Sequence, residues 1–128
     1  EPLSTVEITE GDIVAHFDRF NCLLAETDEG LAMGFALFYP TYSTWQGPCV
    51  YLEDLFVLEA YRARGLGSLL FKTVAAYAFS RDCKRLHWNA LDWNAPALKF
   101  YDSVGAKTLK DWLVLRLGRP QMTSLLDL

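Results

Sequence analysis

The sequence predicts a mixed α/β domain (an α+β mixed sheet) with helices packed on the sheet, and three observations lead to it. Val50–Leu58 is a nearly continuous apolar run, as expected of a central strand buried on both faces. Apolar residues then recur at helical spacing through residues 65–80. Before them, the turn signal Asp28-Glu29-Gly30 lies between two apolar segments and indicates a hairpin.

The elements before the central strand follow from local pattern. Residues 7–18 are predicted to form a short helix entered near Thr9, a residue type that caps helices well. Asn21–Thr27 and Leu31–Tyr39 are predicted as the strands of the hairpin. Pro40–Pro48 is predicted as a loop, because prolines and a glycine punctuate it.

The elements after the helix are a strand, a helix and a last strand. Arg85–Leu91 is predicted as a strand, and Asn94 as the cap of a helix with Pro96 in its first turn. Gly105 is expected just past the end of that helix, and Trp112–Leu117 as the last strand. A meander followed by a βαβ crossover predicts a mixed sheet.

Size and composition narrow the class of protein. The 128 residues suit one domain, 1–128. A formal charge of −4 without a basic stripe gives no sign of a nucleic-acid surface, and no apolar run approaches the length of a membrane span. Three cysteines without a CxxC spacing favour a reducing compartment, so a cytoplasmic location is expected. The two histidines lie far apart, and no metal site is expected.

A segment between the central strand and the helix is a candidate phosphate site. The first turn of a helix has N–H groups without intrahelical partners and a positive dipole end, so it attracts a pyrophosphate. Glycines let the backbone approach the anion, and arginines add charge-assisted contacts. The alternative is that the glycines only end the strand and the arginines only solvate the loop. The candidate residues are Arg62, Ala63, Arg64, Gly65, Leu66, Gly67 and Ser68.

Two acidic residues interrupt the central strand. Glu53 and Asp54 are neighbours, and neighbours on a regular strand point to opposite faces, so only one of them is expected to face a given cleft. A carboxylate on a buried strand is costly unless it is paired or used in chemistry. In one alternative a carboxylate caps a loop or pairs with an arginine, and in the other it acts as a general base.

A tyrosine on the second helix is a further candidate. Tyr101 follows Asn94 by seven residues, about two helical turns, so both are expected near one face. A tyrosine hydroxyl can donate a proton to a leaving group, although most helical tyrosines only pack.

Several strings together resemble a known family, the GNAT acetyltransferase superfamily. The resemblance extends from about residue 6 to residue 117 and is greatest for the spermidine/spermine (diamine), thialysine and plant ornithine acetyltransferase branch. The matching strings are Tyr51-Leu52-Glu53-Asp54-Leu55-Phe56-Val57, Tyr61-Arg62-Ala63-Arg64-Gly65-Leu66-Gly67, Leu91-Asp92-Trp93-Asn94, Phe100-Tyr101 and Gly105-Ala106-Lys107.

The resemblance implies an acetyl-CoA-dependent N-acetyltransferase that acts on a primary amine of a small cationic molecule. It implies Tyr101 as the general acid and Glu53 as the general base. It implies acetyl-CoA binding by Leu55, Phe56, Val57, Asn94 and the residues from Arg62 to Ser68. It implies an amine channel lined by Glu53, Asp54, Trp45, Trp88 and Asn89. No metal is implied, and a homodimer is.

Two alternatives stay open at this level: a protein or peptide N-acetyltransferase, and a CoA-binding module without catalysis. The resemblance also has two departures. The chain starts where the second helix of the family begins, so the expected GNAT-like acyl-CoA N-acyltransferase fold lacks its first strand and helix. The loop Tyr42–Trp45 lacks the acidic residue and proline of polyamine-specific members, which counts against spermidine itself. The candidate acceptors are a diamine or polyamine, thialysine and an ornithine-like amino acid.

Overall fold

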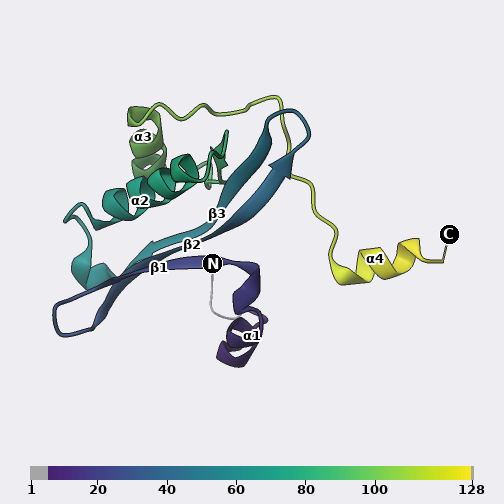
Figure 1. The fold of residues 1–128 in the computed structure, drawn as a ribbon. Helices are drawn as coiled ribbons and strands as arrows, with labels where there is room; N and C mark the ends of the chain where they lie inside the picture. The colour runs from purple at the N-terminus through teal and green to yellow at the C-terminus, as the bar shows by residue number, and fades with distance from the viewer. Residues whose placement is uncertain (1–5, 128) are drawn as a thin grey trace. The chain divides into compact units, whose positions relative to one another are not determined.

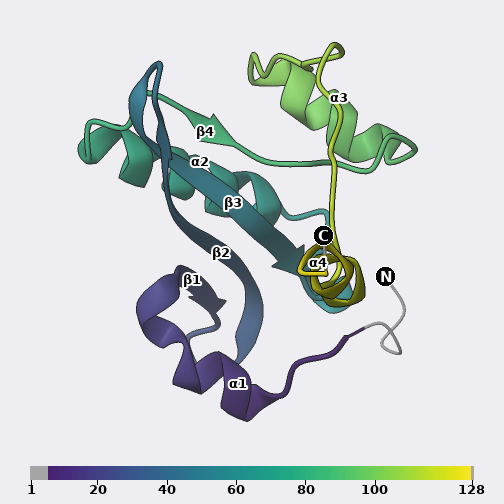
Figure 2. The same ribbon diagram turned by 90° about the vertical axis from the view of Figure 1, so that its right-hand side faces the viewer.

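The computed structural model describes residues 6–127 and divides into two compact units, one ending at Asn89 and one beginning at Ala90. The first unit holds a four-stranded sheet with helix α2 (Leu66–Ser80) on it (Figures 1 and 2). The second holds α3 (Ala95–Ser103) and α4 (Arg119–Leu125). No helix in this described range is long and apolar enough to cross a membrane.

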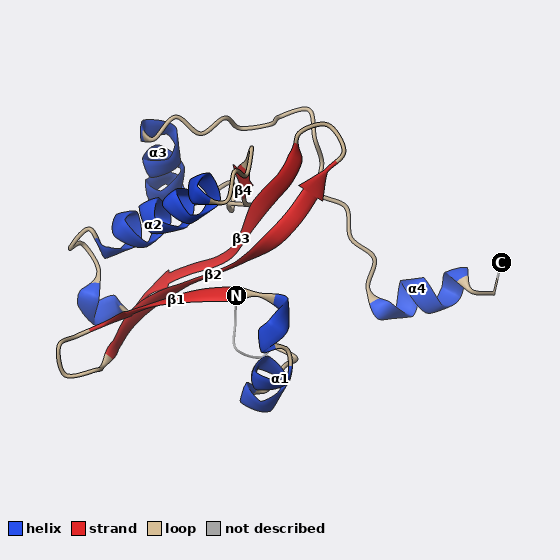
Figure 3. Ribbon diagram, viewed as in Figure 1, coloured by secondary structure: helices blue, strands red, loops and turns tan. Residues whose placement is uncertain are grey.

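The sheet is mixed, as predicted. Its strands are β1 (Asn21–Glu26), β2 (Ala32–Ser43), β3 (Gly47–Val57) and β4 (Leu86–His87), in the spatial order of the chain (Figure 3). The β1–β2 and β2–β3 pairs are antiparallel, and β4 runs parallel to β3 after the crossover through α2. The predicted meander followed by a βαβ unit is therefore confirmed.

Helix α2 (Leu66–Ser80) covers one face of the sheet and buries the core. The Phe38 ring packs edge-on against Tyr77 with centroids 5.0 Å apart, which joins β2 to the helix. Burying such apolar surface is the main favourable term in folding. The core side chains are Ala36, Phe38, Cys49, Val50, Leu52, Leu70, Phe71, Val74 and Ala78.

The predicted first helix is present but shorter than expected. Helix α1 spans Glu10–Ala15 and is followed by the 3₁₀ helix η2 (Phe17–Arg19). Thr9 caps it reciprocally: the Asp12 N–H donates to Thr9 Oγ1 at 3.2 Å, and the Thr9 N–H donates to Asp12 Oδ2 at 2.9 Å. This capping box explains why the helix begins where the sequence indicates.

The predicted loop Pro40–Pro48 is wrong, because most of it is a second hairpin. Strand β2 continues to Ser43 and β3 already begins at Gly47. Pro40 is tolerated in β2 because β1 pairs with β2 only as far as Phe38, so the missing N–H lies where β2 has no strand on that side in the described sheet.

The predicted strands at the C-terminal side are also corrected. The predicted strand Arg85–Leu91 shrinks to the two residues of β4. Residues 112–117 form no strand in the described chain, although their apolar pattern suits one. A strand exists only where a neighbour pairs with its backbone, and sequence pattern alone does not supply that neighbour. The helix capped by Asn94 is confirmed as α3, and α4 was not predicted.

Candidate active site

A β-bulge in β3 places both acidic residues on one face of the sheet. Leu37 pairs with Asp54 and Phe38 pairs with Leu52, so Glu53 is an extra residue on β3. Such a bulge breaks the strict alternation of side chains. Asp54 lies opposite Leu37, which shares a face of β2 with Tyr39. The Tyr39 hydroxyl donates to Glu53 Oε2 at 2.8 Å, which puts Glu53 on that face as well.

The expectation that only one of the two carboxylates faces a given cleft is therefore wrong, and the bulge is the reason. Both carboxylates affect the pKa values of the same neighbouring tyrosines. Burial raises the pKa of Asp54, and the nearby Glu53 charge raises it further. Burial, followed by the bond to Glu53, raises the pKa of Tyr39 to about 12. Tyr51 has its pKa raised by burial first and by both carboxylates after that.

Four residues that the sequence analysis did not name as site candidates form a chain of contacts that starts at Glu53. The Tyr39 and Tyr51 rings lie 5.5 Å apart, and Tyr51 meets the His87 ring edge-on at 5.0 Å. His87 Nε2 lies 3.0 Å from Thr41 Oγ1. Burial lowers the pKa of His87, with a smaller contribution from Arg85. The alternation of polar side chains along β2 and β3 could have identified these residues, but the extra residue Glu53 interrupts that alternation.

The candidate phosphate site forms the turn into α2. Ala63 and Gly65 adopt left-handed backbone conformations, with φ of 63° and 78°. The first bond of the helix runs from the Leu69 N–H to the Gly65 carbonyl at 3.0 Å, so the N–H groups of residues 66–68 belong to the unpaired first turn. Left-handed residues before a helix start form an anion-binding concavity. No atom lies within 4 Å of where a Cβ on Gly65 would stand, which leaves room for an anion.

The two arginines of this turn have contacts with neighbouring residues of the chain. Arg62 Nε donates to the Val57 carbonyl at 2.8 Å, and its guanidinium lies 5.6 Å from the centre of the Phe56 ring. Arg64 lies 5.7 Å from the centre of the Tyr61 ring. Arg62 therefore ties the turn to the end of β3. A Cβ on Gly67 would stand 3.8 Å from Val57 Cγ2, so the helix start and the strand end are in contact.

The predicted cofactor segment Leu55–Val57 lies on a strand edge. Strand β4 pairs with β3 only at Val50 and Tyr51, so beyond Tyr51 that edge of β3 has no neighbouring strand in the described sheet. Edge N–H and C=O groups can bind an extended ligand. On the other side, Gly34 lets β2 approach closely, because a Cβ there would stand 2.6 Å from the Phe56 carbonyl oxygen.

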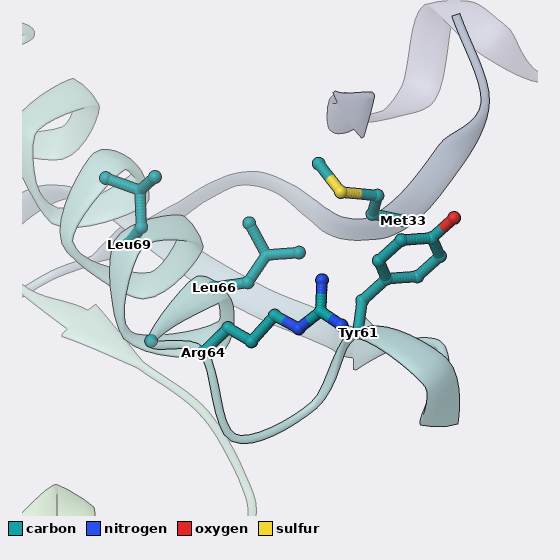
Figure 4. A pocket seen from close by; sticks show the side chains of 6 residues that line it. Met33, Tyr61, Arg64, Leu66 and Leu69 are labelled. Atoms are coloured by element: carbon teal, nitrogen blue, oxygen red, sulfur yellow. The ribbon is translucent and has the colours of Figure 1, made fainter. Parts of the chain in front are cut away.

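A pocket of about 200 Å³ borders the turn (Figure 4). It is largely apolar and lies between β2 and the start of α2. The sequence analysis named three of its residues as phosphate contacts and missed the other three, since a position before a helix does not show what packs beside it. The lining residues are Met33, Tyr61, Arg64, Gly65, Leu66 and Leu69.

The remaining predicted channel residues of this unit are Trp45, Trp88 and Asn89. Trp45 is at the tip of the second hairpin, 95% exposed, and six strand positions separate Gly47 from Glu53, about 20 Å along β3. The Trp88 ring packs edge-on against Phe71 of α2 at 5.0 Å, on the helix-covered side of the sheet. Asn89 is exposed. Their substrate contacts stay predictions.

The second unit holds the other two predicted residues. Asn94 caps α3 through its side-chain oxygen, which accepts from the Ala97 N–H at 3.4 Å. Tyr101 is half-buried on the same helix, and burial raises the pKa of its hydroxyl. Its ring meets Phe100 with centroids 5.6 Å apart. A protonated tyrosine at neutral pH suits the role of a proton donor.

Comparison with known proteins gives the family. The Acetyltransferase (GNAT) family matches residues 3–106. Thialysine N-epsilon-acetyltransferase of Mus musculus is 37% identical over 116 residues, covering 83% of this chain and 68% of the mouse protein. L-ornithine N5-acetyltransferase of Arabidopsis thaliana is 38% identical over 103 residues, covering 78% of this chain and 44% of that protein.

Solved structures have the same fold. An integron cassette protein from the mobile metagenome of V. cholerae superposes with a TM-score of 0.80 at 25% identity, over 97% of this chain and 82% of that one. AAC(6′)-Iy, solved with a CoA-linked bisubstrate analogue, gives a TM-score of 0.72 at 22% identity over 89% of this chain and 84% of that one. The predicted resemblance and the fold class are confirmed. The chain belongs to the GNAT family of acetyltransferases.

Proposed function

We propose that this chain transfers an acetyl group from acetyl-CoA to a primary amine of a small cationic substrate. The observation that carries the proposal is the arrangement along β3. Its bulge turns Glu53 and Asp54 to one face, and its end is tied by Arg62 to an anion-binding turn. The proposed acidic site for a cation therefore lies on β3, and the proposed backbone site for a pyrophosphate lies in the turn that Arg62 ties to its end.

The proposed donor site fits a CoA ester. The left-handed Ala63 and Gly65 and the N–H groups at the start of α2 suit a pyrophosphate, and the edge of β3 at Leu55–Val57 suits the extended arm that follows it. When bound, acetyl-CoA supplies a thioester whose acetyl group an amine can attack. Asn94 is proposed near that arm on family resemblance.

The proposed acceptor site must remove a proton from the amine before the amine can attack. An alkyl amine has a pKa near 10.4, so only about one molecule in a thousand is neutral at pH 7.4, and only the neutral form attacks. The Glu53 and Asp54 carboxylates attract the cation. Glu53 then accepts its proton, directly or through water.

Tyr101 is proposed as the acid that protonates the departing thiolate, a role that rests on the family resemblance. We expect Tyr101→Phe to lower kcat about 100-fold, a typical contribution of general acid catalysis, with the Kd for acetyl-CoA nearly unchanged. Single-turnover kinetics and calorimetry measure the two quantities. An unchanged kcat would remove Tyr101 from the acid role.

The acceptor class is drawn from the relatives, which are named for thialysine and ornithine. The chain spans 68% of the mouse relative and 44% of the Arabidopsis one, and we therefore propose, from their names, the class of acceptor that it uses. A homodimer and a cytoplasmic location are proposed with it. Light scattering that gives a monomer would contradict the dimer.

One experiment tests the proposal. CoA release from acetyl-CoA is followed with thialysine, ornithine, putrescine, spermidine and a peptide with a free N-terminus. We expect turnover with the small diamines and amino acids, and little with the peptide. Faster turnover with the peptide would favour a protein acetyltransferase. Calorimetry that gives CoA binding without turnover on any amine would make the chain a CoA-binding module.

A further inference from the structure

We propose that Tyr39 is a positioning residue for this reaction, whose hydroxyl holds the Glu53 carboxylate where it accepts the amine proton. The inference rests on the proposed function, because it takes Glu53 as the base. Tyr39 belongs to β2, a different strand from Glu53, and fourteen residues separate them in the chain.

The bulge creates the need for such a residue. Glu53 is the extra residue of β3 and has no partner position on β2, so the ladder does not set its orientation as it does for Leu52 and Asp54. The Glu53 side chain is exposed and long, and such a side chain samples several rotamers. A general base must lie within hydrogen-bond distance of the proton that it accepts, so rotamers that place the carboxylate elsewhere lower the rate.

Tyr39 is placed to remove that freedom. Its ring packs against Tyr51, the residue directly opposite it in the β2–β3 register, with centroids 5.5 Å apart. A ring held between two paired strands presents its hydroxyl at one place. The hydroxyl donates to Glu53 Oε2 at 2.8 Å, a charge-assisted bond that leaves the other carboxylate oxygen to take a proton.

The groups around this bond are compatible with the role. Tyr51, Asp54 and His87 are the titratable groups that face it from β3 and β4. The pKa of Tyr39 is raised to about 12, so its hydroxyl keeps its proton and stays a donor at neutral pH. A purely structural bond that stabilises the bulge is the competing explanation, and kinetics separates the two.

The test variant is Tyr39→Phe, which keeps the ring and loses only the hydroxyl. Tyr51→Phe is the matched control, because it makes the same chemical change on the facing residue. With ornithine and thialysine as acceptors, we expect Tyr39→Phe to lower kcat about 10-fold, as for loss of one charge-assisted hydrogen bond, with the KM for acetyl-CoA unchanged.

A double-mutant cycle with Glu53→Gln decides the mechanism. If Tyr39 acts through Glu53, Tyr39→Phe changes kcat less than 2-fold in the Glu53→Gln background. Equal losses in both backgrounds, or a loss in Tyr51→Phe as large as in Tyr39→Phe, would overturn the inference. If Glu53→Gln alone keeps the wild-type kcat, the proposed base itself is wrong, which is a separate failure.

Discussion

The two faces of the β1–β2–β3 sheet carry different kinds of side chain. Under α2 the face is apolar and closed, with Phe38 and Leu52 only 2% and 3% exposed. The opposite face holds Tyr39, Tyr51 and the two exposed carboxylates of β3. One face contributes stability by burying apolar area, and the other carries groups that are costly to bury. A single extra residue in β3 gives the second face both of its carboxylates.

The largest expected effect comes from a substitution on the apolar face that α2 covers. Phe38→Ala removes a buried ring that packs against Tyr77, and we expect the free energy of unfolding to fall by about 3–5 kcal/mol, because a cavity is left. Urea denaturation followed by circular dichroism measures it. Phe79→Ala is the control, since Phe79 is 84% exposed on the same helix as Tyr77. A similar loss in both variants would contradict the comparison.

The next largest effect comes from a substitution on the opposite face, which is expected to lower kcat without unfolding the protein. We expect Glu53→Gln to lower kcat about 100-fold, the usual contribution of a general base, with the melting temperature nearly unchanged. Steady-state kinetics with ornithine and thermal unfolding measure the two. Glu26→Gln, at the exposed end of β1, is the matched control and should keep its activity. Wild-type kcat in Glu53→Gln would place the chemistry elsewhere.

A smaller effect tests the contact between β2 and the end of β3. A Cβ at Gly34 would stand 2.6 Å from the Phe56 carbonyl oxygen, so Gly34→Ala must push the two strands apart. We expect a loss of about 1–3 kcal/mol in unfolding free energy and weaker CoA binding by calorimetry. Gly30→Ala controls for backbone strain alone, since its φ is 86° and no atom lies within 4 Å of its Cβ position. Unchanged CoA affinity in Gly34→Ala would separate Phe56 from the cofactor site.

The smallest effect concerns pH. The folded-state pKa of Asp54 is raised above its ordinary 3.8 by burial and by Glu53, so the unfolded chain loses that proton first as pH rises. Stability from Asp54 is therefore present below pH 3.8 and lost through the window up to its raised pKa. We expect Asp54→Asn to raise stability at pH 7 by less than about 1 kcal/mol, since water screens the site. The gain should vanish below pH 3.8, and melting curves across pH 3–7 test it.

Much of this molecule could be predicted from local pattern. The hairpin turn, the helix start at Thr9 and the cap at Asn94 depend on neighbours within a few residues, so composition and spacing identify them. The turn into α2 was named as a candidate phosphate site for the same reason, because glycines between a strand and a helix have local consequences, and anion binding there stays a prediction. The family strings added the proposed acetyl donor and the proposed roles of Glu53 and Tyr101.

The sequence by itself determined the order of elements, the mixed sheet and the family. Only the tertiary structure decided the strand register and the bulge that comes with it. The bulge turns Glu53 and Asp54 to the same face, where the Tyr39 hydroxyl donates a hydrogen bond to Glu53. It also decided that residues 40–48 extend two strands and that residues 112–117 do not form one. The physical reason is that pairing depends on hydrogen bonds to a partner distant in the chain, while a side-chain pattern records only which face is apolar.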